Sequence, residues 1–161
     1  MLRKYSRVRR RSSKKATNQR PKSKKMLHSL TPKLTNATIR GAVRDYLNGG
    51  ASKQRVVTQY GDISNWNVSN VTNMSEMFYR AESFNQPLKW NVSNVTDMKR
   101  MFHRARSFNQ PLNNWNVSNV RNMDRMFAEA RSFNQPLNKW DVSNVTNMSS
   151  MFYSGVKQLK C

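Results

Sequence analysis

The dominant feature of the sequence is a unit that occurs four times in succession. It runs from Trp66 to Leu88 (WNVSNVTNMSEMFYRAESFNQPL), returns at 90–112 and 115–137, and is cut short at 140–153. The tryptophans that open the four copies are 24, 25 and 25 residues apart. Units of this length cannot bury an apolar face alone, so they fold by stacking on their neighbours. The period therefore predicts a repeat solenoid.

Each copy combines one segment that has helical spacing with one that has none. From Val71 to Phe78 the apolar residues are three, three and one positions apart, which fits one face of a short helix with Ser69 or Asn70 as its N-cap. The segment 83–86 precedes Pro87, and a proline cannot donate to a ladder, so we expect a very short strand that ends there. The unit thus predicts one short helix and one very short parallel strand per repeat.

Stacking would align equivalent side chains in columns. An aromatic column would consist of Phe84, Phe108 and Phe133. A second column would consist of Asn85, Asn109 and Asn134. Paired parallel strands lie roughly 4.8 Å apart, and buried amides need hydrogen-bond partners, so we expect the asparagines to bond to one another or to the turn backbone. Eight of the ten methionines occupy the two Met positions of the four copies, which indicates core filling.

These residues resemble the BspA-like leucine-rich repeat family, also known as mycoplasma-type surface-protein repeats. Its members carry W-[DN]-V-S-N-V-T-[ND]-M-x-x-M-F-x-x-A-x-x-F-N-Q-x-[LI], a pattern that this chain follows from Ile63 to Tyr153. The stretch Leu34–Tyr60 is similar to the lead-in that often precedes the first repeat. The resemblance implies a right-handed, leucine-rich-repeat-like α/β solenoid with an adhesion or interaction role and no catalytic residues. The chain departs from the family in its basic start and in lacking a recognisable export signal.

Three parts follow from this organisation: a disordered basic arm (1–34), a helical cap with lead-in (35–62) and a repeat solenoid of three full repeats and one truncated repeat (63–161). In the cap, a helix is expected over 35–47, with Thr35 or Asn36 as its N-cap, and a second short helix over 52–60. The apolar face of the first helix consists of Ile39, Val43, Tyr46 and Leu47.

The arm carries an extreme charge. Thirteen of the 29 Lys and Arg residues lie within residues 1–34, together with no acid and a single aromatic residue, Tyr5. Such a segment cannot bury enough apolar surface to offset its ordering entropy, and its charge density is typical of a polyanion-binding arm. With one aromatic residue, it would contact phosphate or acidic protein without reading bases. The contacting residues are predicted to be Arg3, Lys4, Arg7, Arg9, Arg10, Arg11, Lys14, Lys15, Arg20, Lys22, Lys24 and Lys25.

Variable positions of the repeats supply a second candidate surface. It consists of Arg100, Arg104, Arg106, Arg125 and Arg131. Aligned copies place Arg104 over Glu129, but they also place Arg100 over Arg125. Like charges in a column are tolerated when they are exposed and screened, or when an anionic partner neutralises them. Both explanations stay open at this point.

Residues for catalysis, metals or cofactors are not apparent in the sequence. His28 and His103 are isolated from other ligand residues, and Cys161 is the single cysteine. No phosphate-binding loop, nucleophile elbow or HExxH motif occurs. No stretch approaches the length of a transmembrane helix, and the arm lacks the apolar region of a signal peptide. We therefore expect no enzyme, no cofactor, no small-molecule substrate and no transmembrane segment.

These features together predict a non-enzymatic protein for binding and assembly. In the leading hypothesis it is a minor structural component of a large assembly, such as a large DNA virus particle. There the solenoid would dock on a protein partner while the arm anchors to a polyanion or to acidic neighbours. The alternative is a sequence-nonspecific nucleic-acid-binding protein, and the third hypothesis is a surface adhesion protein. The expected location is inside a cell or within a virus particle; nuclear and mitochondrial addresses stay open because of the basic start.

Deleting the arm tests its role. Binding of the full chain to duplex DNA is expected to weaken with salt, with a log–log slope of roughly −0.9 per neutralised phosphate, and to be equal for two unrelated sequences. Removing the arm should abolish most of the binding and leave the melting temperature nearly unchanged. Salt titrations and melts of both proteins measure this. DNA affinity that survives the deletion would place the binding site on the arginines of the repeats instead.

Overall fold

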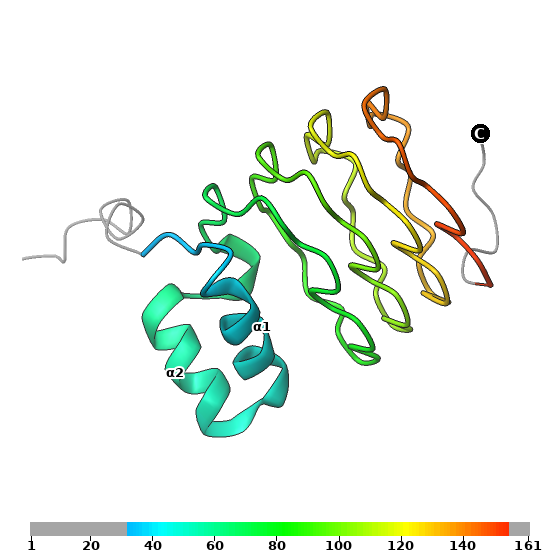
Figure 1. The fold of residues 1–161 in the computed structure, drawn as a ribbon. Coiled ribbons are helices and arrows are strands. Elements are labelled where there is room, and N and C mark those ends of the chain that lie inside the picture. The colour runs from blue at the N-terminus through cyan, green and yellow to red at the C-terminus, as the bar shows by residue number, and fades with distance from the viewer. Residues whose placement is uncertain (1–31, 155–161) are drawn as a thin grey trace, which may run out of the picture.

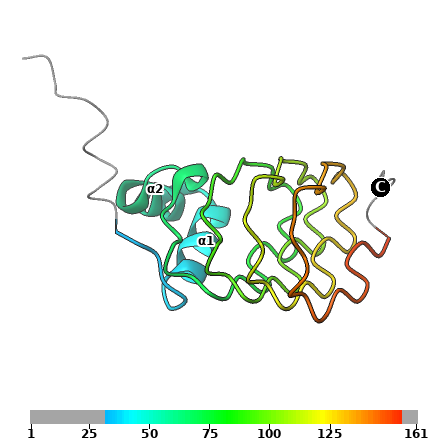
Figure 2. The same cartoon turned by 90° about the horizontal axis from the view of Figure 1, so that it is seen from above.

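The computed structural model describes residues 32–154. Two helices, α1 (Ile39–Asn48) and α2 (Gly50–Tyr60), are followed by the 3-10 turn η2 (Ile63–Asn65). The repeats follow as four coils that lie side by side in chain order (Figure 1). We name them coil 1 (66–88), coil 2 (90–112), coil 3 (115–137) and coil 4 (140–154). Figure 2 shows α1 and α2 at the coil 1 end of the row, with coil 4 at the other end.

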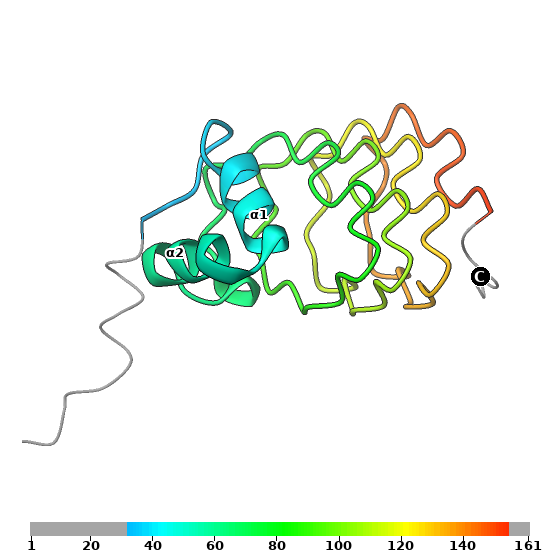
Figure 3. The same cartoon turned by 90° about the horizontal axis from the view of Figure 1, so that it is seen from below.

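Both expected helices are present. Helix α1 begins at Ile39, later than expected, with Thr38 at its N-cap and Asn36 outside the helix. Ile39, Val43 and Tyr46 are buried as predicted, but Leu47 is 40% exposed, so its assignment to the buried face is wrong. Gly49 separates the helices and has a φ of 73°, a conformation that glycine adopts without steric cost. Figure 3 shows α1 beside coil 1 and α2 on the outer side.

The short helix expected over Val71–Phe78 is absent, and turns take its place. The N–H groups of alternate residues leave the segment: that of Glu76 donates to the carbonyl of Lys99 and that of Phe78 to the carbonyl of Met101, both at 2.8 Å. The N–H groups between them bond three residues back, as that of Met77 does to Met74. In a helix all these N–H groups would bond to carbonyls of the same segment. Here every second N–H group bonds to a carbonyl of the next coil instead.

The parallel contacts between coils also differ from the prediction. Isolated parallel bridges join Asn73, Asp97, Asn122 and Asn147 in one column, and the 83–86 segment forms no strand. The other column, predicted from Asn85, Asn109 and Asn134, is confirmed. Asn85 Oδ1 accepts from the backbone N–H of Asn109 at 2.9 Å, and Asn109 Oδ1 accepts from that of Asn134 at 2.9 Å. A side-chain amide thus replaces the strand carbonyl, because it can reach the next coil without an extended backbone.

The core consists of two columns of parallel phenylalanine rings. In the predicted column, Phe108 lies between Phe84 and Phe133 with centroid distances of 6.0 and 6.1 Å. The second column contains Phe78, Phe102, Phe127 and Phe152, with centroids 5.4 to 5.8 Å apart. Phe102 and Phe108 stack within coil 2 at 4.1 Å, which ties the two columns together. Such offset stacking contributes beyond the area that the rings bury.

The tryptophans and methionines complete the core. The indole N–H of Trp90 donates to the carbonyl of Ile63 at 2.7 Å, and that of Trp115 donates to Leu88 at 3.1 Å. Each indole therefore satisfies its polar atom on the preceding unit while its rings stay buried. Met98 and Met101 are fully buried, which agrees with their expected role as core filling. Met148 in coil 4 is 42% exposed, so the prediction is wrong for this methionine, which has no following coil within the described residues to cover it.

Residues 34–40 occupy the place of a coil before coil 1. Leu34 is fully buried and belongs to this core rather than to the basic arm, so a deletion of the arm should end before it. Asn36 Oδ1 accepts from the N–H groups of Thr72 and Asn73 at 2.9 and 3.1 Å. In coil 2 the equivalent N–H groups bond to a backbone carbonyl, that of Thr72. One side-chain oxygen thus substitutes for the carbonyl of a missing coil.

Replacing Phe108 by alanine tests the ring columns. Phe108 is fully buried with a ring on each side, so Phe108→Ala is expected to lower the free energy of unfolding by about 3–5 kcal/mol. Chemical denaturation measures this. Phe152→Ala is the matched control, because Phe152 is only partly buried and has a described ring neighbour on one side. Equal losses for both variants would contradict the column as the centre of the core.

Candidate functional site

Each coil turns twice through a left-handed backbone conformation that is unusual for residues other than glycine. The residues with positive φ are Glu76, Arg80, Arg100, Arg104, Arg125, Glu129, Ser150 and Ser154, with φ between 51° and 62°. None of them is buried. A residue held in this region costs on the order of 1–3 kcal/mol, and the inter-coil hydrogen bonds offset that cost. Two columns of polar side chains therefore leave the coils at fixed positions.

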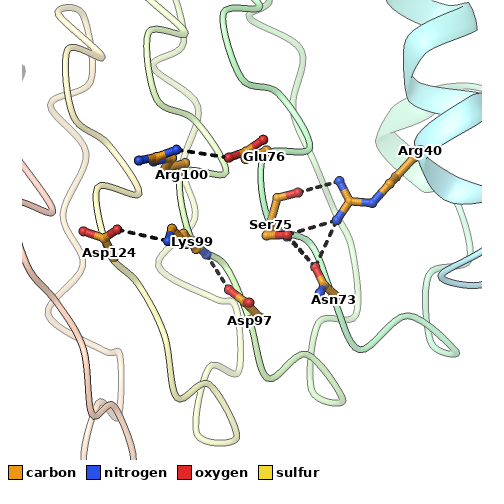
Figure 4. Close-up of polar contacts among 8 residues, drawn as sticks. All are labelled: Arg40, Asn73, Ser75, Glu76, Asp97, Lys99, Arg100 and Asp124. Carbon is orange, nitrogen blue, oxygen red and sulfur yellow. Dashed lines mark hydrogen bonds and ion pairs between the residues drawn. The ribbon is translucent and has the colours of Figure 1, made fainter.

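Ion pairs connect coils 1 and 2 along these columns. Arg100 Nη1 lies 3.3 Å from Glu76 Oε1, and Arg106 Nη1 lies 3.0 Å from Glu82 Oε2. All four side chains are at least one-third exposed, so each pair adds little to stability. The pairs do fix the direction of the two arginines, which point back toward coil 1. Figure 4 shows Arg100 beside Glu76.

A tighter cluster connects coils 2 and 3. Glu129 Oε1 lies 2.9 Å from Arg104 Nε and 3.3 Å from His103 Nε2. The hydrogen bond from Arg104 holds the pKa of the Glu129 carboxyl below its ordinary value of 4.5, and His103 lowers it further. The same hydrogen bond raises the pKa of Arg104. A third contact, 3.7 Å between Lys99 Nζ and Asp124 Oδ2, is drawn in Figure 4.

The predicted arginine face therefore divides into two groups. Arg100, Arg104 and Arg106 are each engaged by an acid from a neighbouring coil. Arg125 and Arg131 on coil 3 are exposed, and no residue within 32–154 forms an ion pair with them. The acids of the repeats thus neutralise the three arginines of this face on coil 2 and leave Arg125 and Arg131 of coil 3 for solvent or a partner.

A contact that the repeat pattern did not predict comes from α1. Arg40 Nη1 donates to the carbonyl of Ser75 at 2.6 Å, and Arg40 Nη2 donates to Asn73 Oδ1 and Ser75 Oγ at 3.0 Å each. Figure 4 shows the guanidinium reaching from α1 to the edge of coil 1. Arg40 lies outside the repeats, so no period in the sequence signals its role.

A cleft lies beside this contact, between α1 and coil 1. It has a volume of about 280 Å³. Its walls are Arg40, Val43, Arg44, Leu47 and Asn48 from α1 and Glu76, Met77 and Tyr79 from coil 1. Leu47 and Tyr79 are 40% and 37% exposed, and both belong to its walls, so the cleft gathers apolar surface that the core does not use.

The repeats also match a known protein family. Residues 50–160 match the model of a family described as "Mycoplasma protein of unknown function, DUF285". The chain belongs to the DUF285 family. It is a mycoplasma-type repeat family of BspA-like surface protein repeats, which agrees with the resemblance in the repeat residues. No curated protein and no solved structure matches the chain. The DUF285 match includes α2 and all four coils, whereas α1 and its face of the cleft lie outside it.

The predicted contact residues of the basic arm, from Arg3 to Lys25, lie outside the described residues. Within residues 32–154, no group of three or more His, Cys, Asp or Glu side chains could hold a metal ion. In the same part of the chain no helix is long and apolar enough to cross a membrane.

The Glu129 cluster predicts how stability depends on pH. Because the folded-state pKa of Glu129 is lowered, its stabilising effect is present above the unfolded value and is lost as the pH falls through the folded value. Glu129→Gln should therefore reduce the loss of stability on going from pH 6 to below 4.5. Urea denaturation across this range measures it. Glu82→Gln, which removes a more exposed ion pair, is the control, and an equal effect from both variants would contradict a special role for the cluster.

Proposed function

We propose that this protein is a non-enzymatic binding and assembly protein, built as a leucine-rich-repeat-like solenoid of BspA-like repeats with a helical cap and a basic N-terminal arm. The observation that carries the proposal is the division of the arginine face. Arg125 and Arg131 lie on the same coil and have no acidic partner within 32–154, while the equivalent arginines of coil 2, Arg100 and Arg106, do.

This arrangement suits recognition of an anionic surface. The backbone at Arg125 is held by a hydrogen bond from its N–H to the carbonyl of Ser149 at 2.9 Å, so the start of the side chain is fixed before any partner arrives. A fixed position lowers the ordering entropy that binding must overcome. Arginine also binds carboxylates through two parallel hydrogen bonds, which gives direction as well as charge. An acidic protein surface is the partner that fits these properties.

The leading role is a minor structural component in a large assembly, such as a virus particle. The repeats would dock on an acidic protein neighbour, and the arm would anchor to a polyanion or to further acidic chains. The charge of the arm favours sequence-nonspecific nucleic-acid binding as the second candidate, since thirteen cations and no acid lie within residues 1–34.

The test of this function is capture of the partner by the tagged full chain from its own cells at moderate salt. Arg125→Gln/Arg131→Gln is expected to lose most of the captured protein. Lys53→Gln/Arg55→Gln on α2, which removes the same charge away from the coils, should capture as much as the parent. Mass spectrometry of the eluates gives the amounts. Equal capture by both double variants would show that the coil 3 arginines are not the docking surface, and recovery of nucleic acid alone would favour the second candidate.

A further inference from the structure

The inter-coil ladder has a direction that leaves the edge of coil 1 incomplete. Alternate N–H groups of each coil donate to carbonyls of the next coil, as those of Phe78 and Arg80 donate to Met101 and His103 at 2.8 and 2.9 Å. Carbonyls at the equivalent positions of coil 1 therefore point away from coil 2, toward α1. Ser75 confirms this direction, because its carbonyl accepts from Arg40 of α1.

Two positions further along, α1 no longer supplies donors. The next carbonyls of this row belong to Met77 and Tyr79, and no residue within 32–154 donates a hydrogen bond to either. Both residues line the cleft between α1 and coil 1. A row of carbonyls spaced by two residues is the edge that an extended chain binds through its own alternate N–H groups.

The opposite wall of the cleft is one stripe of α1. Its members, Arg40, Val43, Arg44, Leu47 and Asn48, are spaced three, one, three and one residues apart, as required for a single helix face. Leu47 and Tyr79 supply exposed apolar surface. The ring of Tyr79 is held in place, with His103 edge-on at 5.3 Å and the guanidinium of Arg80 5.2 Å from its centroid. The site is thus formed before an occupant enters.

Charge defines the chemistry of the occupant. Arg44 keeps 74% of its side chain exposed, and its described acidic neighbour is Asp45, next to it in the chain, at 4.0 Å. Glu76, the acid in the cleft, is engaged by Arg100. An acidic side chain entering the cleft would therefore meet Arg44, whereas a basic segment would meet Arg40 and Arg44 with like charge.

The geometry points to a docking site for an extended, acidic segment of a partner protein in this cleft. Alternate N–H groups of the segment bond to the carbonyls of Met77 and Tyr79, an apolar side chain packs on Leu47 and Tyr79, and a carboxylate pairs with Arg44. This inference rests on the proposed binding role and adds a second contact site, on a helix outside the DUF285 match.

Other occupants fit the cleft less well. The basic arm of this chain carries no acid within residues 1–34 to pair with Arg44. Phosphate oxygens of a nucleic acid are hydrogen-bond acceptors and cannot bond to the carbonyls of Met77 and Tyr79. A complete coil of a second copy is larger than a volume of about 280 Å³.

The experiment uses the full chain and the peptide acetyl-Ser-Val-Glu-Val-Glu-Val-Ser-amide, with binding followed by NMR titration up to millimolar concentration. The expected result is shifts confined to α1 and to residues 75–80. Methylating alternate peptide nitrogens, in each of the two registers, is expected to abolish binding in one register, since it removes the donors and keeps every side chain. The same peptide with Lys in place of Glu is expected not to bind.

Protein variants locate the contacts. Arg44→Gln should weaken binding about threefold to fivefold, as expected for an exposed ion pair, and Tyr79→Ser about tenfold. Arg55→Gln and Tyr153→Ser are the matched controls, because Arg55 lies on α2 and Tyr153 occupies the slot of Tyr79 on coil 4; both should bind like the parent. Melting curves establish that each variant is folded.

Several results would overturn the inference: no binding of the Glu peptide, equal binding of both methylated peptides, tighter binding of the Lys peptide, or no effect of Arg44→Gln and Tyr79→Ser. The double variant Arg125→Gln/Arg131→Gln separates this site from the coil 3 face. It should leave peptide binding unchanged. If it abolished peptide binding while Arg44→Gln did not, the cleft would be excluded and the proposed function on coil 3 would stand.

Discussion

Hydrogen bonds between alternate backbone groups of successive coils are the interaction on which the rest of this structure depends. In the turn segment of each coil, alternate N–H groups donate to carbonyls of the next coil, at 2.7–2.9 Å from Met123 to Glu129 as in the earlier coils. Outside this segment the direction reverses, since the N–H groups of Thr96 and Arg121 donate to the preceding coil. Every second N–H group must point toward the next coil. This requires residues in the left-handed conformation at two places in each coil. The phenylalanine columns then stack because this ladder fixes the distance from coil to coil.

A directional ladder gives the two ends of the row different chemistry. At coil 1 the carbonyl of Ser75 faces α1 and accepts from the Arg40 guanidinium. The N–H groups of Thr72 and Asn73 also face this end, and both donate to Asn36 Oδ1. These are side-chain contacts from a segment with no repeat, and within 32–154 none of them extends to the carbonyls of Met77 and Tyr79. The cleft beside Met77 and Tyr79 is the direct result.

Much of the fold could be predicted from the sequence, because a fixed period carries its own geometry. The period identified the repeating unit, the Phe108 and Asn109 columns and the buried methionines except Met148, and local patterns identified both helices. The helix expected over Val71–Phe78 failed for a physical reason: spacings of three, three and one also fit a chain of turns, and Glu76 and Arg80 carry no signature of a left-handed conformation. The candidate sites were more difficult to predict than the fold. The repeat alignment identifies the arginine columns, but which arginines pair with an acid depends on side-chain direction. Arg40 lies outside any repeat, so no alignment points to it.

The left-handed positions have a consequence for how such a chain can vary. Because the left-handed residues recur at equivalent positions of every coil, successive coils have the same backbone course, and we expect that one unit can be duplicated or lost without changing the cap or the final coil. The number of repeats can therefore change while both ends of the row stay the same. Each added or lost unit lengthens or shortens the surface columns by one position. Duplication of repeats would thus set the distance between a site on α1 and a site on the last coils.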